Sequence, residues 1–405
     1  MKIFWCFLVL SVIIFSCCTG QIYQTAPISI SKRDNSVHEE NTKHNERIIK
    51  IDSFVIRTVT DKHLAFPDVA QLPDGRFLLV YREGAGHVDS TGRIMCQLSR
   101  DGYSWTEPQV FYDDSVYDDR DPSITVLPDS TVGLVFFKYR KGIKNKTPNV
   151  HHLFFGCCRF PALKIVKAIQ LDPGEMNITE AITEGSIWQT MSGKEIKVEA
   201  ASSKMIIYGN KWIIPAYGGY PLLRRDTVFT SPASRISLFI SADKGKTFVQ
   251  HMIHPGEKKD VYLQEPCLLA LDDSTMLMHI RTATGSPYLA GPMMQSRSGD
   301  GGHTWSGWTE LPVIGHAPFL YKCEGCLISA FRMLNQEYTR EYTAFMVSYD
   351  QGRSWSDPQI VEDYGEDECG YPSIVSISET KFLMVYYSDG GKSVKGAVFE
   401  LKQSK

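Results

Sequence analysis

The chain has very little excess charge, because its 43 Lys and Arg residues almost balance its 46 Asp and Glu residues, leaving a net charge of -3. This balance argues against a basic surface for nucleic acid or anionic lipid. The sequence also contains no glycine-rich phosphate loop and no coenzyme motif. Its eleven histidines are scattered, and the adjacent His151 and His152 would point to opposite faces of a strand. We therefore expect no nucleic acid, no cofactor and no metal.

The cysteines lack the spacing of a disulfide framework. Seven of the ten follow residue 18, which is an odd number, so we expect mostly buried thiols. Cys323 and Cys326 have the two-residue gap of a metal or redox pair, but no second pair accompanies them. Because Glu324 and Gly325 fit a hairpin turn, the prediction favours ordinary thiols at both positions.

The apolar run at the N-terminus is too short for a spanning helix. Residues 1–20 contain a single Lys and then an apolar run that ends in a small residue and cysteine, which is the pattern of an export signal. The stretch Ile14–Cys17 resembles a permissive bacterial lipobox, which implies a lipid on Cys17, or on Cys18 if cleavage slips by one residue. Residues 21–48 are polar and predict a flexible tether. We expect an exported bacterial lipoprotein, periplasmic or in the outer membrane, that meets the membrane only through this lipid.

A short pattern of Ser, Asp, Gly, Ser or Thr, and an aromatic residue recurs four times. The Asp can bond backbone N–H groups two residues on, the Gly allows a positive φ, and the aromatic side chain can be buried between strands. The copies occupy residues 99–105, 241–248, 298–305 and 348–355. Each copy is predicted to fasten one β-hairpin. The pattern resembles the Asp box of sialidases and other BNR-repeat proteins, and this resemblance implies a propeller or a similar array.

Six strongly apolar strands of similar length also recur. They start at residues 76, 132, 211, 275, 326 and 381, between 51 and 79 residues apart. Their branched and aromatic residues indicate central strands rather than helices. We predict an all-β, six-bladed β-propeller over residues 49–405, and we expect it to be monomeric. Residues 49–56 would supply the fourth strand of the last blade and close the ring. The long gap between residues 138 and 211 predicts an insertion near residues 171–192, as a rim loop or lid.

Polar residues are expected to converge at one mouth of the central channel. Five innermost strands carry a proline, at Pro67, Pro122, Pro266, Pro318 and Pro372. The residues just before these prolines would face the mouth. The second strands return antiparallel to it, and four of their last residues are cations, namely Arg82, Lys138, Arg281 and Arg332. Four like charges repel unless an anion is held among them, and the planar fork of Arg matches a carboxylate. The sequence therefore predicts an acidic glycan as the substrate.

Tyr371 and Glu265 each precede one of these prolines, so both should point into the channel. There the carboxylate can accept the proton of the phenol and make it nucleophilic. The pairing resembles that of sialidases. This resemblance implies that Tyr371 is the nucleophile, that Glu265 and Arg281 form the Glu-strand-Arg unit of the family, and that Arg332 lies near the third arginine of its carboxylate-binding triad.

The loop 82–89 lies where sialidases keep their acid/base Asp, so the resemblance makes Asp89 the acid/base candidate. His87 is the alternative, because imidazole also titrates near neutrality. The chain departs from the family at Ala65, where the Phe-Arg-Ile-Pro motif of sialidases has its Arg. Either Arg120 or Arg82 could substitute for this Arg, which would shift the bound carboxylate. The substrate-binding candidates are Arg82, His87, Arg120, Asp121, Arg281, His316 and Arg332.

Three functions remain open at this stage. The first is an exo-acting glycosidase of the sialidase superfamily that forms an adduct on Tyr371 and removes a terminal acidic sugar, sialic acid or a related one. The second is a propeller polysaccharide lyase, or another glycosidase, on glycans that contain uronic acid, with Tyr371 or His87 moving the proton next to the carboxylate. The third is a lipoprotein that binds glycans without catalysis.

Overall fold

The computed structural model divides the chain into two units, Met1–Glu40 and Asn41–Lys405. It describes residues 48–140, 150–159, 163–165, 168–171, 175–177, 194–196, 198–220, 233–253, 261–284 and 289–402, all in the second unit. Every regular element among these residues is a β-strand, and no helix in this part of the chain could cross a membrane. The predicted export signal, Cys17 and residues 21–47 lie outside the described residues, whereas Ile48, predicted as the end of the tether, begins the first strand.

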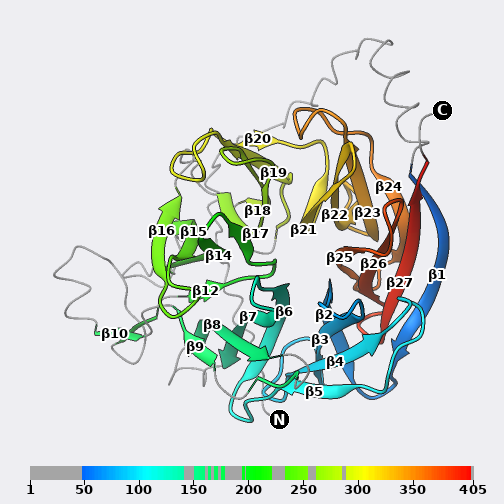
Figure 1. Cartoon of the computed structure of the whole chain (residues 1–405), viewed down its shortest axis with the longest axis horizontal. Coiled ribbons are helices and arrows are strands. Elements are labelled where there is room, and N and C mark those ends of the chain that lie inside the picture. Colours follow the sequence, from blue (N-terminus) through cyan, green and yellow to red (C-terminus); the bar gives the residue numbers. More distant parts are fainter. Residues whose placement is uncertain are drawn as a thin grey trace, which may run out of the picture. The chain divides into compact units, whose positions relative to one another are not determined.

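Six antiparallel sheets make up the second unit (Figure 1). The first contains β2 (His63–Gln71), β3 (Phe77–Gly84), β4 (Arg93–Ser99) and β5 (Gln109–Tyr112). The second contains β6 (Asp118–Val126), β7 (Thr131–Arg140), β8 (Val150–Arg159) and β9 (Ala168–Gln170). The third contains β12 (Val198–Ala200), β13 (Ile206–Tyr208), β14 (Lys211–Tyr220), β15 (Ala233–Ser241) and β16 (Val249–Ile253).

The remaining three sheets follow in chain order. The fourth contains β17 (Val261–Ala270), β18 (Met276–Thr284), β19 (Met294–Ser298) and β20 (Thr309–Glu310). The fifth contains β21 (Ile314–Cys323), β22 (Cys326–Leu334), β23 (Glu341–Ser348) and β24 (Gln359–Gly365). The sixth contains β25 (Gly370–Ser376), β26 (Lys381–Ser388), β27 (Ser393–Leu401) and β1 (Ile48–Thr58). A small hairpin of β10 (Glu175–Asn177) and β11 (Lys194–Ile196) is all that is described of the region around the predicted insertion, together with Leu171.

The first strands of neighbouring sheets pack against one another around a common axis. Strand β2 contacts both β6 and β25, and β21 contacts both β17 and β25. The third sheet bridges the second and the fourth, because β12 contacts β7 and β8 while β14 contacts β17. Figure 1 shows the six sheets arranged as blades around this axis. The predicted all-β, six-bladed propeller is therefore confirmed.

The N-terminal strand closes the ring, as the sequence predicts. Strand β1 pairs antiparallel with β27, from Ile48 opposite Leu401 to Thr58 opposite Ser393. The last blade thus takes its outer strand from the start of the domain and its other three from the end. Because β1 covers the outer edge of β27, the final strand of the chain is left with no unpaired edge.

The four Asp boxes lie between the third and fourth strands of their blades. In the box that starts at Ser348, its hydroxyl donates to Asp350 Oδ1 (2.8 Å) and accepts from the Gly352 amide (2.7 Å). Asp350 accepts from the Ser354 amide at 2.8 Å, and Trp355 is buried against the neighbouring blade. The boxes beginning at Ser99, Ser241 and Ser298 repeat the Ser–Asp bond and the bond from the glycine amide. The boxes fasten hairpins, as predicted.

One cysteine prediction is wrong. Cys323 and Cys326 form a disulfide across the turn between β21 and β22, where ordinary thiols are predicted. The hairpin itself explains the difference, because the two residues are paired directly across the strands, with Glu324 and Gly325 as the turn. The other cysteines among the described residues are free thiols, and all except Cys157 are buried.

Candidate functional site

The innermost strands of five blades share a backbone distortion at one end of the channel. In each, the pairing with the second strand skips two residues, and the residue just before the proline has a positive φ. These residues are Phe66 (56°), Asp121 (48°), Glu265 (50°), Ala317 (46°) and Tyr371 (50°). A following proline normally pushes a residue to extended backbone, so this conformation is strained. Strain repeated five times around one axis indicates a functional site.

The distortion turns the side chains before the prolines toward the channel. Phe66, Asp121, Ala317 and Tyr371 line one small axial cavity of about 20 Å³. The second strands bring Arg82, Arg281, Arg332, Tyr217 and Tyr387 to this same end, opposite Ala65, Gln264, His316, Ala200 and Gly370. Arg281 and Arg332 thus meet Glu265 and Tyr371 at one end of the channel, whereas Arg82 and Lys138 of the predicted set are held by Asp118 and Asp114.

Lys138 does not belong to this set. The position equivalent to Arg82 in the second blade is Phe137, which lies opposite Arg120, whereas Lys138 pairs with Asp119. Successive side chains of a strand point to opposite faces, so this one-residue difference turns Lys138 away from the channel. Its ammonium group instead forms an ion pair with Asp114.

Tyr371 and Glu265 meet in the channel. The Tyr371 hydroxyl donates to Glu265 Oε1 at 2.6 Å, and Arg281 Nη1 donates to the same oxygen at 2.9 Å. The second oxygen of Glu265 accepts from the Ala317 amide at 2.7 Å. Burial opposes ionisation of Glu265, but Arg281, the Tyr371 hydroxyl and Arg332 outweigh it and lower its pKa below the usual value. Burial and the Glu265 charge raise the pKa of Tyr371 well above that of a free phenol. The pair thus holds a neutral phenol against an ionised base.

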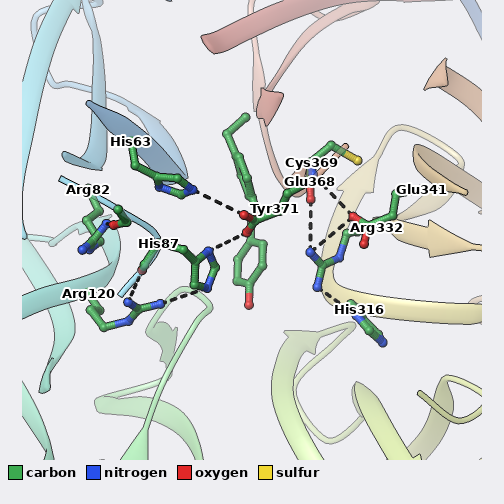
Figure 2. Close-up of polar contacts among 12 residues, drawn as sticks. His63, Arg82, His87, Arg120, His316, Arg332, Glu341, Glu368, Cys369 and Tyr371 are labelled. Atoms are coloured by element: carbon green, nitrogen blue, oxygen red, sulfur yellow. Dashed lines mark hydrogen bonds and ion pairs between the residues drawn. The ribbon is translucent and has the colours of Figure 1, made fainter. Parts of the chain in front are cut away.

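Arg332 lies beside the ring of Tyr371, with its Cζ 5.8 Å from the ring centroid (Figure 2). Its Nη2 donates to Nδ1 of His316 at 2.9 Å, and it is paired with Glu341 at 3.5 Å. Since a guanidinium can only donate, Nδ1 of His316 must be an acceptor and its proton must lie on Nε2. Burial and the nearby Arg281 and Arg332 lower the pKa of His316 well below its usual range, so the ring is neutral. Its Nε2–H is buried and has no hydrogen-bond partner.

Asp121 has an unusual environment for a carboxyl group. It is 4% exposed and lies beside Arg120, whose Nε is 3.9 Å from Asp121 Oδ1. Burial and the Glu265 charge raise the pKa of Asp121 to about 7, although Arg120 opposes the shift. Arg120 itself is held by Asp118 Oδ2 at 3.1 Å. Asp121 can therefore hold a proton near neutral pH.

Asp89, the predicted acid/base residue, is bonded on both oxygens. Oδ2 accepts from the Gly86 amide (2.8 Å) and pairs with Arg82 (3.1 Å), and Oδ1 accepts from the Thr91 amide (2.5 Å). Burial opposes the shift, but these bonds lower the pKa of Asp89 to about 2. Asp89 is therefore ionised at neutral pH in this conformation. Arg82 is fully buried and is also paired with Asp118 at 2.6 Å, so it holds the loop rather than facing the mouth.

The structure adds two residues that the sequence analysis missed, His63 and Glu368. Figure 2 shows the rings of His63 and His87 directed at Glu368. His63 Nε2 is 3.3 Å from Glu368 Oε2, and His87 Nδ1 is 2.6 Å from Glu368 Oε1. Tyr387 also donates to Glu368 Oε1 at 2.6 Å. The only sequence signal for Glu368 is its place three residues before Tyr371, and His63 stands two residues before Ala65. The prediction of no metal ligands rested on spacing along the chain, which does not reveal this cluster.

Several buried polar atoms around the mouth have no hydrogen-bond partner in the part of the chain that the structure describes. Buried polar groups normally find one, so a group of exceptions in one place needs an explanation. The atoms at this end of the channel are Asp121 Oδ1, Gln264 Oε1, Arg281 Nε, His316 Nε2 and Arg332 Nε. Donors and acceptors are mixed, which suits a ligand rich in hydroxyl groups. Each guanidinium already has a carboxylate neighbour, so the predicted repulsion among unpaired cations is not what marks the site.

Comparison with known proteins also supports a BNR-repeat propeller. Residues 201–384 match the model of the BNR repeat-like domain. In sequence alone, the chain matches none of the curated proteins.

The fold is similar to a crystal structure of a protein of unknown function from Dyadobacter fermentans, with a TM-score of 0.72 and 18% identity over 88% of this chain and 100% of that one. It is also similar to Trypanosoma rangeli sialidase in complex with sialic acid, with a TM-score of 0.55 and 13% identity over 87% of this chain and 57% of that one. Penicillium chrysogenum alpha-L-arabinanase complexed with arabinobiose has a TM-score of 0.60 and 13% identity, over 88% of this chain and 100% of that one.

The chain is thus a six-bladed β-propeller in which residues 201–384 are similar to the BNR repeat-like domain. More particularly, its fold is similar to those of Trypanosoma rangeli sialidase and Penicillium chrysogenum alpha-L-arabinanase.

Proposed function

We propose that this propeller is an exo-acting, retaining glycoside hydrolase that removes a terminal acidic sugar, with Tyr371 as the nucleophile. The observation that carries the proposal is the 2.6 Å hydrogen bond from the Tyr371 hydroxyl to Glu265, whose oxygen also accepts from Arg281. A phenol with a raised pKa is a poor nucleophile by itself. A carboxylate held ionised at hydrogen-bond distance can take its proton as the new bond forms.

The first step breaks the glycosidic C–O bond and joins the anomeric carbon to the Tyr371 oxygen. The phenolic proton passes to Glu265, and the departing oxygen takes a proton from Asp121. We assign this proton to Asp121 rather than to Asp89, because Asp121 has a pKa of about 7 and Asp89 one of about 2. In the second step, Asp121 accepts a proton from water as the water oxygen attacks the anomeric carbon. The bond to the Tyr371 oxygen breaks, and this oxygen takes its proton back from Glu265. Two groups whose pKa values are pushed apart in one site fit an acid and a base.

The acidic group of the sugar would bind beside Arg332. The Arg332 guanidinium donates to His316 Nδ1, and its buried Nε has no hydrogen-bond partner among the described residues. A carboxylate can accept from this free N–H, and charge-assisted bonds of this kind are the strong ones. Arg281 also adds positive charge near this position while it stays paired with Glu265. Ala65 removes the Arg that sialidases place here, so the proposed substrate is an acidic sugar, sialic acid or a relative.

The test is to incubate the purified protein with a panel of sialosides and uronate-capped glycans and to identify the products by mass spectrometry. Tyr371→Phe should lower hydrolysis by about 10³-fold or more while substrate binding is kept. Tyr103→Phe is the matched control, because Tyr103 is exposed on the Asp box of the first blade. Hydrolysis by Tyr371→Phe at the rate of the unaltered protein would remove the nucleophile assignment.

The same incubation separates the alternatives. Products with a new double bond, which absorb in the ultraviolet, would assign a lyase instead. The alternative of a non-catalytic glycan-binding protein predicts that glycans bind and no product forms. In that case, substitution of Tyr371, Glu265 or Asp121 would change nothing except the affinity for the glycan.

We also propose that the chain is exported as a bacterial lipoprotein with its lipid on Cys17. Support comes only from the apolar N-terminal run and the Ile14–Cys17 pattern. Metabolic labelling with a fatty acid should mark the expressed protein and should fail for a Cys17→Ser, Cys18→Ser double variant. Labelling that survives the double variant contradicts this anchor.

A further inference from the structure

Three potential metal ligands come together beside the proposed catalytic residues. His63, His87 and Glu368 each offer one ligand atom, and these atoms all lie within 4.8 Å of one another. They arrive from separate parts of the ring: the start of β2, the loop after β3 and the loop before β25. Figure 2 shows both rings directed at the Glu368 carboxylate. Two imidazoles and one carboxylate on a common centre are the ligand set of many open zinc sites.

The arrangement is held from outside, as ligand side chains usually are. The Tyr387 hydroxyl donates to Glu368 Oε1 at 2.6 Å and fixes the carboxylate from the side of the channel. The backbone of Gly391 packs on the His63 ring, because a Cβ at that glycine would lie 2.3 Å from His63 Nε2. The Phe66 ring packs edge-on against His87, with centroids 5.6 Å apart. Each ligand is therefore oriented by a neighbour that is not itself a ligand.

Exposure differs among the three in a way that suits an open site. The His63 side chain is 8% exposed and that of Glu368 is 29% exposed, whereas that of His87 is 44% exposed. An ion held by these groups would have protein on one side and solvent on the other. The cluster adjoins the channel through Phe66, whose ring contacts both His87 and Tyr371.

We propose that His63, His87 and Glu368 form a binding site for one divalent transition-metal ion, with zinc as the best fit. The ligand atoms are His63 Nε2, His87 Nδ1 and a Glu368 carboxylate oxygen, and solvent or a substrate oxygen takes the fourth position. A carboxylate can only accept, so His63 Nε2 and His87 Nδ1 carry the imidazole protons that face Glu368. On binding, each proton moves to the far nitrogen of its ring, Arg120 Nη2 gives up its 3.4 Å contact with His87 Nε2, and the hydrogen bonds to Glu368 are replaced by bonds to the ion. The site is separate from the Tyr371 and Glu265 pair and does not depend on the proposed hydrolysis.

Metal binding to the whole chain tests the proposal without any substrate. The protein is stripped with a chelator, dialysed, and titrated with Zn²⁺ by calorimetry, and Co²⁺ is added separately to follow its visible absorption. We expect one Zn²⁺ per chain and the intense visible bands of four-coordinate Co²⁺. His87→Ala and Glu368→Gln should each weaken binding by more than the roughly 10–100-fold that loss of an outer partner costs. The exposed position of His87 makes its variant the less disruptive of the two.

His303→Ala is the matched control, because His303 is exposed on an Asp-box turn far along the chain from the cluster. It should keep the affinity of the unaltered protein. Circular dichroism and the melting temperature without metal establish that each variant is folded. If no Zn²⁺ binds, or if His87→Ala binds it as tightly as His303→Ala does, the three residues are only a hydrogen-bonded His–Glu–His cluster and the proposal is wrong.

Discussion

At the scale of single residues, environment rather than residue type separates the two carboxyl groups of the channel. Asp121 and Glu265 hold equivalent places, each just before a proline and each with a positive φ. Glu265 is bonded by Arg281, Tyr371 and a backbone amide, which favour its charged form. Asp121 has an oxygen without any hydrogen-bond donor, so burial and the nearby Glu265 charge dominate. Local bonding thus makes one group a base and the other an acid.

This difference predicts the pH dependence of the proposed reaction. Asp121 must be protonated to act as the acid, so hydrolysis should fall as the pH rises through about 7. Asp121→Asn should lose most of the activity on natural glycosides, and the remaining activity should no longer fall as the pH rises through about 7. It should still release the leaving group from a nitrophenyl glycoside, which needs no proton, and this is measured as a burst of nitrophenol.

Asp89→Asn provides the comparison at the residue scale. Because Asp89 is paired with Arg82, its loss should lower stability while the alkaline limb stays near pH 7. If the loss of activity above about pH 7 disappears in Asp89→Asn and persists in Asp121→Asn, Asp89 is the acid/base residue, as the sialidase resemblance implies.

At the scale of elements, the Asp box stabilises a hairpin end by hydrogen bonds that its own short sequence supplies. Asp350 accepts from the amides of Arg353 (3.0 Å) and Ser354 (2.8 Å), and Trp355 anchors the turn against the neighbouring blade. This local character explains why the boxes could be recognised from sequence, as particular residues at particular spacings. Their contribution is to architecture, since none of the described box residues lines the channel cavity.

Asp350→Ala should lower the free energy of unfolding by about 1–2 kcal/mol, because two amides and the Ser354 hydroxyl lose an ionised acceptor. The effect is measured by urea denaturation of the full chain. Asp273→Ala, at an exposed turn, is the control and should leave the midpoint unchanged. Equal midpoints for the two variants would show that the box bonds contribute nothing to stability.

At the scale of the whole molecule, an ion pair between the buried Asp68 and the half-buried Lys204 links several blades. Asp68 Oδ2 accepts from the Ile124 amide at 2.6 Å, and Oδ1 accepts from Ser373 and pairs with Lys204 at 2.7 Å. The Lys204 ammonium also donates to the backbone oxygens of Val69 and Ile124. The first, second, third and sixth blades are thereby joined at one carboxylate.

Asp68→Ala should cost about 1–3 kcal/mol, because the Ile124 amide, the Ser373 hydroxyl and the half-buried Lys204 ammonium lose their acceptor. Thermal and urea unfolding of the full chain measure the effect. Asp74→Ala, on an exposed turn of the same blade, is the control and should be close to neutral. If the Asp68 variant unfolds at the same temperature and urea concentration as the Asp74 variant, the bonds to Asp68 do not stabilise the ring.

Ring closure gives a second prediction at this scale. Removing residues 1–58 deletes β1 and exposes the edge of β27, so the product should be less stable and should self-associate. Removing residues 1–47 keeps the whole strand and is the matched control. Size-exclusion chromatography and thermal melts compare the two truncations, and equal behaviour would contradict a role for β1 in closing the ring.

The sequence by itself determined the strand pattern, the Asp boxes, the proline positions and the closing strand, because each is read from residues close together in the chain. It also singled out Tyr371 and Glu265, since both follow one positional rule. Only the tertiary structure decided which charged groups meet. His63 and Glu368 are 305 residues apart in the chain, and a register difference of one residue turns Lys138 away from the channel. Contacts of this kind depend on the exact pairing and packing of blades, which local pattern does not contain.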